Sequence, residues 1–347
     1  MSINIGTFTI GSKFLPFIIA EAGINHNGDL SLAKKMIHVA KESGASAIKF
    51  QTFKAHEFIA DINQTYTYKS QGKEITEPMI DMFKRCEFSR DEWFKIKQFC
   101  DDEKILFMSS PLNCSDLDLL VEINTPAIKL GSTDFTNIPF LKYCTSTKLP
   151  IILSCGMSFL SEIKEALTTV GAFDGYPIIL LVTTSEYPTP SKDVNLLKFQ
   201  KIKEEFPSIP LGFSDHTQGY LASSLAVTFG ACVFEKHFTL DNDLPGPDHW
   251  FSENPNGLKN WINAIHTSFD MMGSPEIHPT KIELENKKNY QKIIVSLSTI
   301  KKGEIFNENN IGMKRVFGGN GLHPRFFSKL LGKHANQDYD YGEKIID

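Results

Sequence analysis

The feature that most constrains the fold of this chain is a series of short apolar runs, each ending in polar residues. Runs of five to seven apolar, often β-branched residues are typical of buried parallel strands. A charged or hydroxyl side chain at the last position is costly to bury unless that strand end opens into a pocket. Eight such runs occur, in the order FIIAEAG, AIKFQT, ILFMSSP, AIKLGS, PIILSCG, IILLVTT, LGFSDH and CVFEKHF.

Segments with helical patterns separate most of these runs. Asp29 can cap a helix that ends before Gly44, and Ser89 can cap another that leads to Cys100. This alternation predicts an α/β fold, a (β/α)8 TIM barrel whose active site gathers at the C-terminal mouth of the strands. The polar stretch 53–80 breaks the rhythm, and a loop of that length after a barrel strand is more often functional than not.

The composition changes after the last predicted barrel helix, so we expect three regions. Residues 1–272 form the barrel domain, and the charged stretch 273–292 has the pattern of a linker. Residues 293–347 contain two similar Gly-turn segments, KKGEIF and DYGEKI, which suggest a small β-rich domain. A unit of that size buries little apolar surface and would be marginally stable alone.

The overall composition narrows the class of protein. The net charge of −5 gives no polycationic surface, which argues against nucleic acid as a partner. No apolar run reaches the roughly 18 residues of a membrane span, so we expect no membrane partner, and the N-terminus lacks a secretory signal pattern. Six cysteines without CxxC spacing indicate reduced thiols in a cytoplasmic protein.

Two lysines lie inside otherwise apolar runs and are the first candidates for chemistry. A buried lysine needs a counter-charge or loses its proton. If Lys49 and Lys129 face one space with serine hydroxyls nearby, they form an anion cradle suited to phosphate and carboxylate. Two alternatives remain open: each lysine pairs with a structural carboxylate such as Glu21 or Glu235, or one lysine forms a Schiff base. The candidate hydroxyl donors are Ser132, Ser154 and Ser214.

Two histidines end the last two runs and are the candidate metal ligands. Strands seven and eight are neighbours in a closed barrel, so His216 and His237 can point into one pocket. Two neutral imidazoles with open positions for substrate suit Lewis-acid polarisation of a carbonyl. The alternative is a pair of histidines that only make hydrogen bonds in the barrel rim.

Four carboxylates are expected on the same rim: Glu21, Asp134, Asp215 and Asp248. One of them can act as general acid or base if burial brings its pKa toward neutrality, although a rim hydrogen bond or ion pair is the more common fate. Tyr187, in the stiff segment YPTP, is either a ligand platform or packing.

The motifs together resemble the sialic acid synthases, a family that includes N-acetylneuraminate, legionaminic and pseudaminic acid synthases. The similarity covers nearly the whole chain, and the tail resembles the antifreeze-like (SAF) domain that closes these enzymes. Nine short motifs occur in the family's order: IAEAGINHNGDLSLAKKMI, IKFQT, SSPL, KLGS, SCGM, YPTP, GFSDHT, EKHFT and PGPD.

The resemblance implies a transferase that condenses phosphoenolpyruvate with an N-acylated hexosamine aldehyde, giving a nine-carbon 2-keto acid and phosphate. Glu21, Asp134 and Asp248 become the candidate catalytic carboxylates, and Mn²⁺ or Mg²⁺ would lie on His216 and His237. Arg315 would reach the sugar's acyl group from the partner subunit of a domain-swapped homodimer. The implied phosphoenolpyruvate ligands are Lys49, Ser110, Lys129, Ser132, Ser154 and Ser214, and the implied sugar ligands are Gln51, Tyr187 and Arg315.

Departures from the family's pattern cluster on the sugar side. Asp134 stands where a glutamate is usual, Ser185 replaces an asparagine before YPTP, and Val316 replaces a proline after Arg315. These changes suggest an altered acceptor sugar with unaltered chemistry. The alternatives are another phosphoenolpyruvate-aldose condensing enzyme, of the 3-deoxy-ketulosonate type, and a barrel that binds a sugar phosphate without turnover.

Overall fold

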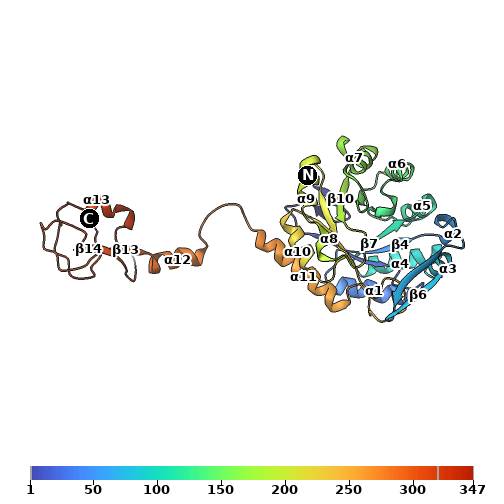
Figure 1. Cartoon of the computed structure of the whole chain (residues 1–347), viewed down its shortest axis with the longest axis horizontal. Helices are drawn as coiled ribbons and strands as arrows, with labels where there is room; N and C mark the ends of the chain where they lie inside the picture. Colours follow the sequence, from blue (N-terminus) through green and yellow to red (C-terminus); the bar gives the residue numbers. More distant parts are fainter. Residues whose placement is uncertain (1, 319, 347) are drawn as a thin grey trace. The chain divides into compact units, whose positions relative to one another are not determined.

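The computed structural model describes residues 2–318 and 320–346. The chain forms two compact units, Met1–Gly273 and Ser274–Asp347, and Figure 1 shows the elements of both. Among the described residues, no helix combines the length and the hydrophobicity that a bilayer crossing needs.

The first unit is a nearly closed barrel of eight parallel strands, which confirms the predicted (β/α)8 fold. The strands are hydrogen-bonded in chain order, β12 lies beside β3, and β7 and β8 contact each other at the two ends of the sheet. Each of the eight apolar runs contains one strand: β3 Phe17–Gly23, β4 Ala47–Thr52, β7 Leu106–Pro111, β8 Ile128–Leu130, β9 Ile151–Ser154, β10 Ile178–Thr183, β11 Leu211–Ser214 and β12 Val233–His237.

Helices cover the outside of the barrel (Figure 1). The Asp29 carboxylate accepts hydrogen bonds from the first backbone amides of α1, and Ser89 forms a capping box at the start of α4, so both predicted caps are confirmed. The covering helices are α1 Leu30–Glu42, α4 Arg90–Asp102, α5 Cys114–Glu122, α6 Ile138–Ser146, α7 Leu160–Thr169, α9 Lys198–Glu205, α10 Leu221–Thr228 and α11 Pro255–Met272. Shorter turns are η1 Ser132–Asp134, η2 Ala172–Asp174 and α8 Ser191–Val194.

The barrel interior changes from apolar to polar along the strands. At the N-terminal end, the hairpin of β1 Ile3–Ile5 and β2 Phe8–Ile10 packs in one apolar cluster with inward residues of the barrel strands. Strand side chains alternate between faces, so the residue two positions further along each strand points the same way. There the interior becomes polar, because Ile19, Ala47, Met108, Ala127, Ile152, Leu181 and Val233 are followed by Glu21, Lys49, Ser110, Lys129, Ser154, Thr183 and Glu235.

The polar stretch 53–80 is structured rather than irregular. It contains α2 Ala55–Phe58 and an antiparallel hairpin of β5 Thr65–Ser70 and β6 Lys73–Pro78, and α3 Met79–Lys84 follows. The predicted loop therefore contains secondary structure of its own. Most side chains of the hairpin are exposed, so its sequence shows no alternation of apolar and polar residues.

The second unit has a small apolar core under a two-stranded antiparallel sheet. Core residues include Ile294, Phe306 and Tyr339, and the Gly-turn segments place Gly303 and Gly342 at positive φ. Residues 273–292, expected to be a linker, contain a helix that starts with a capping box at Thr280. The elements are α12 Lys281–Tyr290, β13 Lys292–Ser296, β14 Ile311–Arg315, η3 Pro324–Phe326 and α13 Phe327–Leu330.

Candidate active site

A cavity of about 590 Å³ opens at the C-terminal ends of the barrel strands, and every barrel strand contributes side chains to it. Most predicted site residues line this cavity: Glu21, Lys49, Gln51, Ser110, Lys129, Ser132, Asp134, Ser154, Tyr187, Ser214, His216 and His237. Asp248 lines an adjoining cavity instead. Arg315 is an exposed residue at the end of β14 in the second unit.

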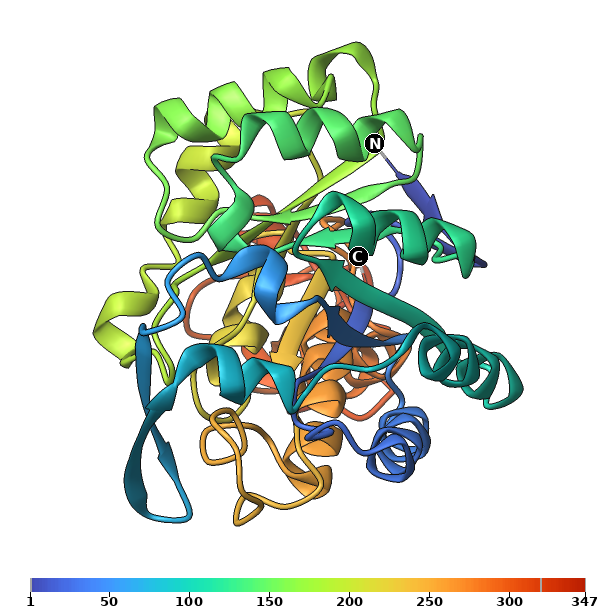
Figure 2. The same ribbon diagram turned by 90° about the vertical axis from the view of Figure 1, so that its right-hand side faces the viewer.

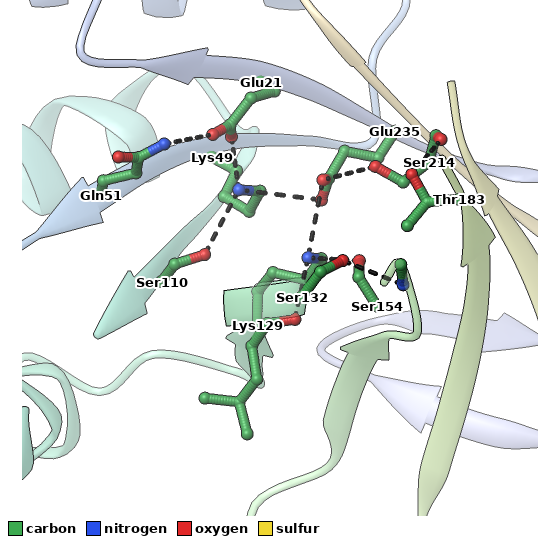
Figure 3. A network of polar contacts seen from close by, with 12 residues as sticks. Glu21, Lys49, Gln51, Ser110, Lys129, Ser132, Ser154, Thr183, Ser214 and Glu235 are labelled. Carbon is green, nitrogen blue, oxygen red and sulfur yellow. Dashed lines mark hydrogen bonds and ion pairs between the residues drawn. The ribbon is translucent and has the colours of Figure 1, made fainter. Parts of the chain in front are cut away.

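Two lysines and two glutamates form the centre of the site (Figure 3), and we call Glu21, Lys49, Lys129 and Glu235 the ion quartet. Lys49 Nζ lies 2.7 Å from Glu21 Oε2 and 3.8 Å from Glu235 Oε2. Lys129 Nζ lies 3.6 Å from Glu235 Oε1. All four side chains are buried. The two interpretations of the lysines therefore hold together: both face one cavity, and both have carboxylate partners.

Strand register brings the quartet together. Glu21 on β3 is the direct neighbour of Lys49 on β4, and Ser214 on β11 is the neighbour of Glu235 on β12. Neighbouring residues on one face of a sheet have Cβ atoms about 5 Å apart, which is close enough for these side chains to pair. Because alternate residues of each strand point into the barrel, the strand register determines which side chains meet at the site.

Burial and the neighbouring charges together shift the pKa values of the quartet in different directions. Burial raises the pKa of Glu21 to about 7, although the Lys49 ammonium opposes this. Burial also lowers the pKa of Lys129 to about 8, with Glu235 opposing. Burial disfavours the ionised form of Glu235 too, but Lys129 and Lys49 outweigh it and hold its pKa below the ordinary value. Within the quartet, Glu21 is therefore the carboxyl group that can exchange a proton near neutral pH.

Hydroxyl groups surround the two ammonium groups. Lys129 Nζ donates to Ser154 Oγ at 2.8 Å, and Lys49 Nζ donates to Ser110 Oγ at 3.3 Å. Ser214 Oγ donates to Glu235 Oε1 at 3.1 Å. Ser132 Oγ accepts from the backbone N–H of Gly156 at 3.0 Å. Hydroxyls beside buried cations are the donors that a phosphate or carboxylate ligand needs.

The two predicted metal ligands lie on one side of the cavity, with ring centroids 5.8 Å apart. His216 Nδ1 lies 2.7 Å from the Thr184 carbonyl oxygen, so Nδ1 carries the proton and Nε2 keeps its lone pair. His237 Nδ1 is buried and has no hydrogen-bond partner among the described residues. The Tyr187 ring packs on both imidazoles, with centroids 4.1 Å from His216 and 5.6 Å from His237.

These imidazoles fit an open site for a divalent cation. Burial lowers the pKa of His216 to about 4 and that of His237 well below its usual range, so both rings are neutral at pH 7 and present lone pairs. Within residues 2–318 and 320–346, no group of three or more His, Cys, Asp or Glu side chains is placed to hold a metal. The protein would supply two ligands, and substrate or water would supply the others.

The remaining carboxylates take three different positions. Burial raises the pKa of Asp134, at the cavity rim, and it raises the pKa of Asp248 to about 6. Asp248 Oδ2 lies 3.9 Å from His237 Nδ1. Asp215 was expected on the rim but lies away from the cavity, where it pairs with Lys236 at 3.1 Å. Asp215 and Lys236 precede His216 and His237 in sequence, so they face the opposite side of their strands.

Three polar groups converge on Gly23, at the end of β3. A Cβ at this position would lie 3.3 Å from Glu21 Oε1, 3.6 Å from Gln51 Nε2 and 3.7 Å from Asp248 Oδ2. Gly23 also has φ of +52°, which side-chain-bearing residues rarely adopt. The absence of a side chain therefore leaves room among these three groups.

We expect Gly23→Ala to impair this part of the site. The methyl group would occupy the shared space and raise the KM of whatever ligand these groups bind by about tenfold, while the left-handed backbone costs about 1–2 kcal/mol. Steady-state kinetics with each substrate varied in turn would measure the effect. Gly171→Ala is the matched control, because Gly171 is also left-handed and lies far along the chain outside the cavity. Equal KM values for both variants would show that the groups around Gly23 do not bind a substrate.

Comparison with known proteins agrees with this geometry. The model of the NeuB family matches residues 36–276, which is more than half of the chain. The chain belongs to the NeuB family. It is 37% identical over 340 residues to the N,N'-diacetyllegionaminic acid synthase of Legionella pneumophila, covering 97% of this chain and 95% of that protein.

Further NeuB family relatives cover similar lengths. The N,N'-diacetyllegionaminic acid synthase of Campylobacter jejuni is 39% identical over 330 residues, covering 94% of this chain and 98% of that protein. The crystal structure of N-acetylneuraminic acid synthetase from Leptospira borgpetersenii, in complex with citrate, is similar with a TM-score of 0.74 and 33% identity, over 82% of this chain and 95% of that one. These relatives support an enzyme of the nonulosonic acid synthase type.

For this NeuB family barrel, sequence reasoning undervalued Glu235. It was considered only as a counter-charge for a lysine, yet it lies between both lysines of the quartet and also accepts a hydrogen bond from Ser214. The signal was present in the sequence: Val233, Glu235 and His237 alternate along one strand, so the face that carries the predicted ligand His237 must also carry Glu235.

Proposed function

We propose that this protein is a nonulosonic acid synthase that condenses phosphoenolpyruvate with an N-acylated hexosamine aldehyde and water. The products are a nine-carbon 2-keto acid and inorganic phosphate. The observation that carries the proposal is the convergence of two buried ammonium groups and four serine hydroxyls on one cavity in a NeuB family barrel. Such a cradle suits a small ligand with both a phosphate and a carboxylate.

Phosphoenolpyruvate would bind at the quartet. A pKa of about 8 means that the protein surroundings disfavour the charged Lys129 amine by roughly 3 kcal/mol relative to water. An anionic ligand would relieve this cost, because it supplies the negative charge that Glu235 alone does not. Burial disfavours the charged form of Lys49 too, but Glu21 and Glu235 outweigh it and raise its pKa, so Lys49 would bind the anion as a permanent cation. Ser110, Ser132, Ser154 and Ser214 would be the hydroxyl donors.

The reaction forms one carbon–carbon bond and breaks one carbon–oxygen bond. The enol carbon attacks the aldehyde, water adds to the resulting oxocarbenium-like carbon, and the tetrahedral intermediate expels phosphate. Glu21 would give its proton to the aldehyde oxygen and then, as a carboxylate, accept a proton from the attacking water. Glu235, which stays ionised, would stabilise the positive carbon. A divalent cation such as Mn²⁺ or Mg²⁺ on His216 and His237 would supply polarisation of the carbonyl.

The acceptor sugar would lie beside the two imidazoles. Gln51 Nε2 donates to Glu21 Oε1 at 3.4 Å, and Asp248 lies on the other side of Gly23. Both side chains can therefore bind sugar hydroxyls close to the proton of Glu21. The Tyr187 ring would form a flat wall against the sugar, and Asp134 would lie toward the attacking water. Asp134 is one methylene shorter than glutamate, which is consistent with a changed acceptor.

The second unit would complete the site of another subunit. In this proposal the protein is a domain-swapped homodimer, and Arg315 of the partner subunit binds the N-acyl group of the sugar. We expect Arg315→Ala to raise the acceptor KM by about tenfold to hundredfold, the loss of one charged hydrogen bond, with little change in the KM of phosphoenolpyruvate. An unchanged acceptor KM would exclude Arg315 from the site.

Mixing two variants would show which subunit supplies the arginine. If Arg315 acts across the dimer, a refolded mixture of Arg315→Ala and Lys129→Met chains contains one intact site in each mixed dimer. At low acceptor concentration such a mixture should recover about a quarter of wild-type activity. If Arg315 acts within its own chain, every site carries a defect and the mixture stays inactive.

The function itself is tested by phosphate release. Purified protein, Mn²⁺ and phosphoenolpyruvate are incubated with N-acetylmannosamine or with 2,4-diacetamido-2,4,6-trideoxyhexoses, and the product mass is read. We expect acceptor-dependent phosphate and a 2-keto acid with nine carbons. Binding without phosphate release from any hexosamine would support a non-catalytic barrel instead, and turnover with a simple aldose phosphate would support a 3-deoxy-ketulosonate synthase.

A further inference from the structure

A second cavity of about 590 Å³ adjoins the first, and five residues line both: Gln51, Phe83, Thr133, Tyr187 and His237. The ion quartet lines only the first cavity. A substrate that reacts at the quartet and is longer than the reacting carbons can therefore extend past these five shared residues into the second cavity.

Two segments far apart in sequence form the walls of this second cavity. One is the β5–β6 hairpin and the other is the loop after β12, and Figure 2 shows both beside the barrel mouth. They are tied together by hydrogen bonds from Gln71 Nε2 to the Asp243 carbonyl oxygen at 2.9 Å and from the Gly246 amide to Ser70 Oγ at 3.1 Å. Lys69 Nζ lies 5.0 Å from the centre of the Trp250 ring.

The hairpin is also anchored at its base. Tyr68 donates its hydroxyl to Glu77 Oε1 at 2.6 Å, and Arg85 makes two hydrogen bonds to the same carboxylate at 2.6 and 2.7 Å. Tyr66 stacks on Tyr68 with a centroid distance of 5.8 Å. The cavity wall is therefore held by contacts within the protein itself, as expected of a binding site that does not have to be ordered on binding.

The lining favours a ligand group that is uncharged and partly apolar. Aromatic and aliphatic side chains dominate: Ile24, Tyr66, Tyr68, Phe83, Trp250 and Phe251. Among the described lining residues Lys69 is the one lysine or arginine, and it is already engaged with Trp250, while Glu74 and Asp248 contribute acids. A phosphate group would meet two carboxyl groups and one occupied cation, whereas a methyl or acylamino group would contact aromatic rings.

We infer that this cavity is the subsite for the far end of the acceptor, and that it selects a 6-deoxy hexose with a second acylamino group over an acceptor with hydroxyls or a phosphate there. The inference rests on the proposed function, because it assumes that the aldehyde end of the sugar reacts at the quartet. The deoxy methyl and the second acyl methyl would pack on Tyr66, Trp250 and Phe251. The Tyr66 hydroxyl and Asp248 would bind the remaining polar atoms.

The test compares three acceptors with wild-type protein and two variants. The acceptors are a 2,4-diacetamido-2,4,6-trideoxyhexose, N-acetylmannosamine and N-acetylmannosamine 6-phosphate. For the wild type we expect kcat/KM to be at least about tenfold higher with the first acceptor than with either of the others. Tyr66→Ala should lower kcat/KM for that acceptor by about tenfold, mainly through KM, lower kcat/KM for N-acetylmannosamine by a smaller factor, and leave the KM of phosphoenolpyruvate unchanged.

Tyr143→Ala is the matched control. Tyr143 is 38% exposed and Tyr66 39% exposed, but Tyr143 lies on α6 and donates to Asp118. A wild-type preference for N-acetylmannosamine or its phosphate would overturn the inference, and so would an equal effect of Tyr66→Ala on all acceptors. Either result would leave the synthase function standing. Failure of every acceptor to release phosphate would instead overturn the proposed function, so the two failures are distinguishable.

Discussion

Lys129→Met will lower kcat/KM for phosphoenolpyruvate by about a thousandfold, the equivalent of roughly 4 kcal/mol, or two charge-assisted hydrogen bonds. Lys129 is buried at the centre of the cavity, and its ammonium group lies between Ser154 and Glu235. Methionine fills a similar volume without charge. In the variant, Lys49 is the one remaining cation near Glu235. The net charge of the quartet is one unit more negative, which disfavours the binding of an anion.

The pH dependence of the wild type reports on the same group. Burial lowers the pKa of Lys129 from 10.5 to about 8, so the amine is charged below pH 8 and neutral above it. Because the charged form binds the anion, kcat/KM for phosphoenolpyruvate should fall as the pH rises through 8, by about tenfold per pH unit at the limit. In Lys129→Arg any remaining activity should lose the part of the decline that lies near pH 8, since guanidinium stays protonated, and keep the part near pH 7 where Glu21 loses its proton.

Two controls separate this role from structural damage and from imine chemistry. Lys201→Met removes an exposed lysine on α9 and should leave the kinetics unchanged. Borohydride with acceptor should not inactivate the wild type, because in our proposal Lys129 acts as a cation and not as a nucleophile. A wild-type kcat/KM for phosphoenolpyruvate in Lys129→Met would contradict the role of Lys129 in binding the anion. Inactivation by borohydride would favour a lysine imine.

The barrel and most of its site could be predicted because both depend on local signals. Buried parallel strands need apolar runs. A polar residue at the end of such a run is unusual, and it indicates where the strand reaches the C-terminal mouth of the barrel. The predictions for two acids failed because they ignored which face of the strand each residue occupies. Asp215 was expected on the rim but pairs with Lys236 on the outer face. Glu235 was expected only as a counter-charge, although it lies on the inner face within the site. Period-two alternation from His216 and His237 would have separated these two acids.

Segments whose side chains are exposed could not be predicted in the same way. The β5–β6 hairpin is held by contacts with the loop after β12, roughly 170 residues away in sequence. No pattern in residues 53–80 predicts these contacts. Helix α12 buries none of its side chains, so it lacks the apolar stripe that identifies a helix. Its capping box at Thr280 and Glu283 was the one usable signal. The position of Asp248 likewise depends on how its loop packs.

His237→Ala should abolish the metal response of the protein and leave the metal-free fold intact. His237 Nδ1 has no hydrogen-bond partner among the described residues, so its removal leaves no partner of that atom unpaired; the ring contacts with Tyr187, His216 and Phe251 are lost. We expect metal affinity to fall at least a hundredfold, since loss of a supporting contact alone costs about ten- to hundredfold. Turnover in the presence of Mn²⁺ should fall with it.

A stability measurement tests this prediction without relying on activity. Mn²⁺ at one hundred times its dissociation constant should stabilise the wild type by about 2.7 kcal/mol, seen as a rise in Tm. His237→Ala should melt near the metal-free wild type and show no rise with Mn²⁺. His266→Ala, on α11, is the control and should keep the full response. A Mn²⁺-dependent rise of Tm that survives in both His237→Ala and His216→Ala would place the metal elsewhere, because the two imidazoles are then not what holds it.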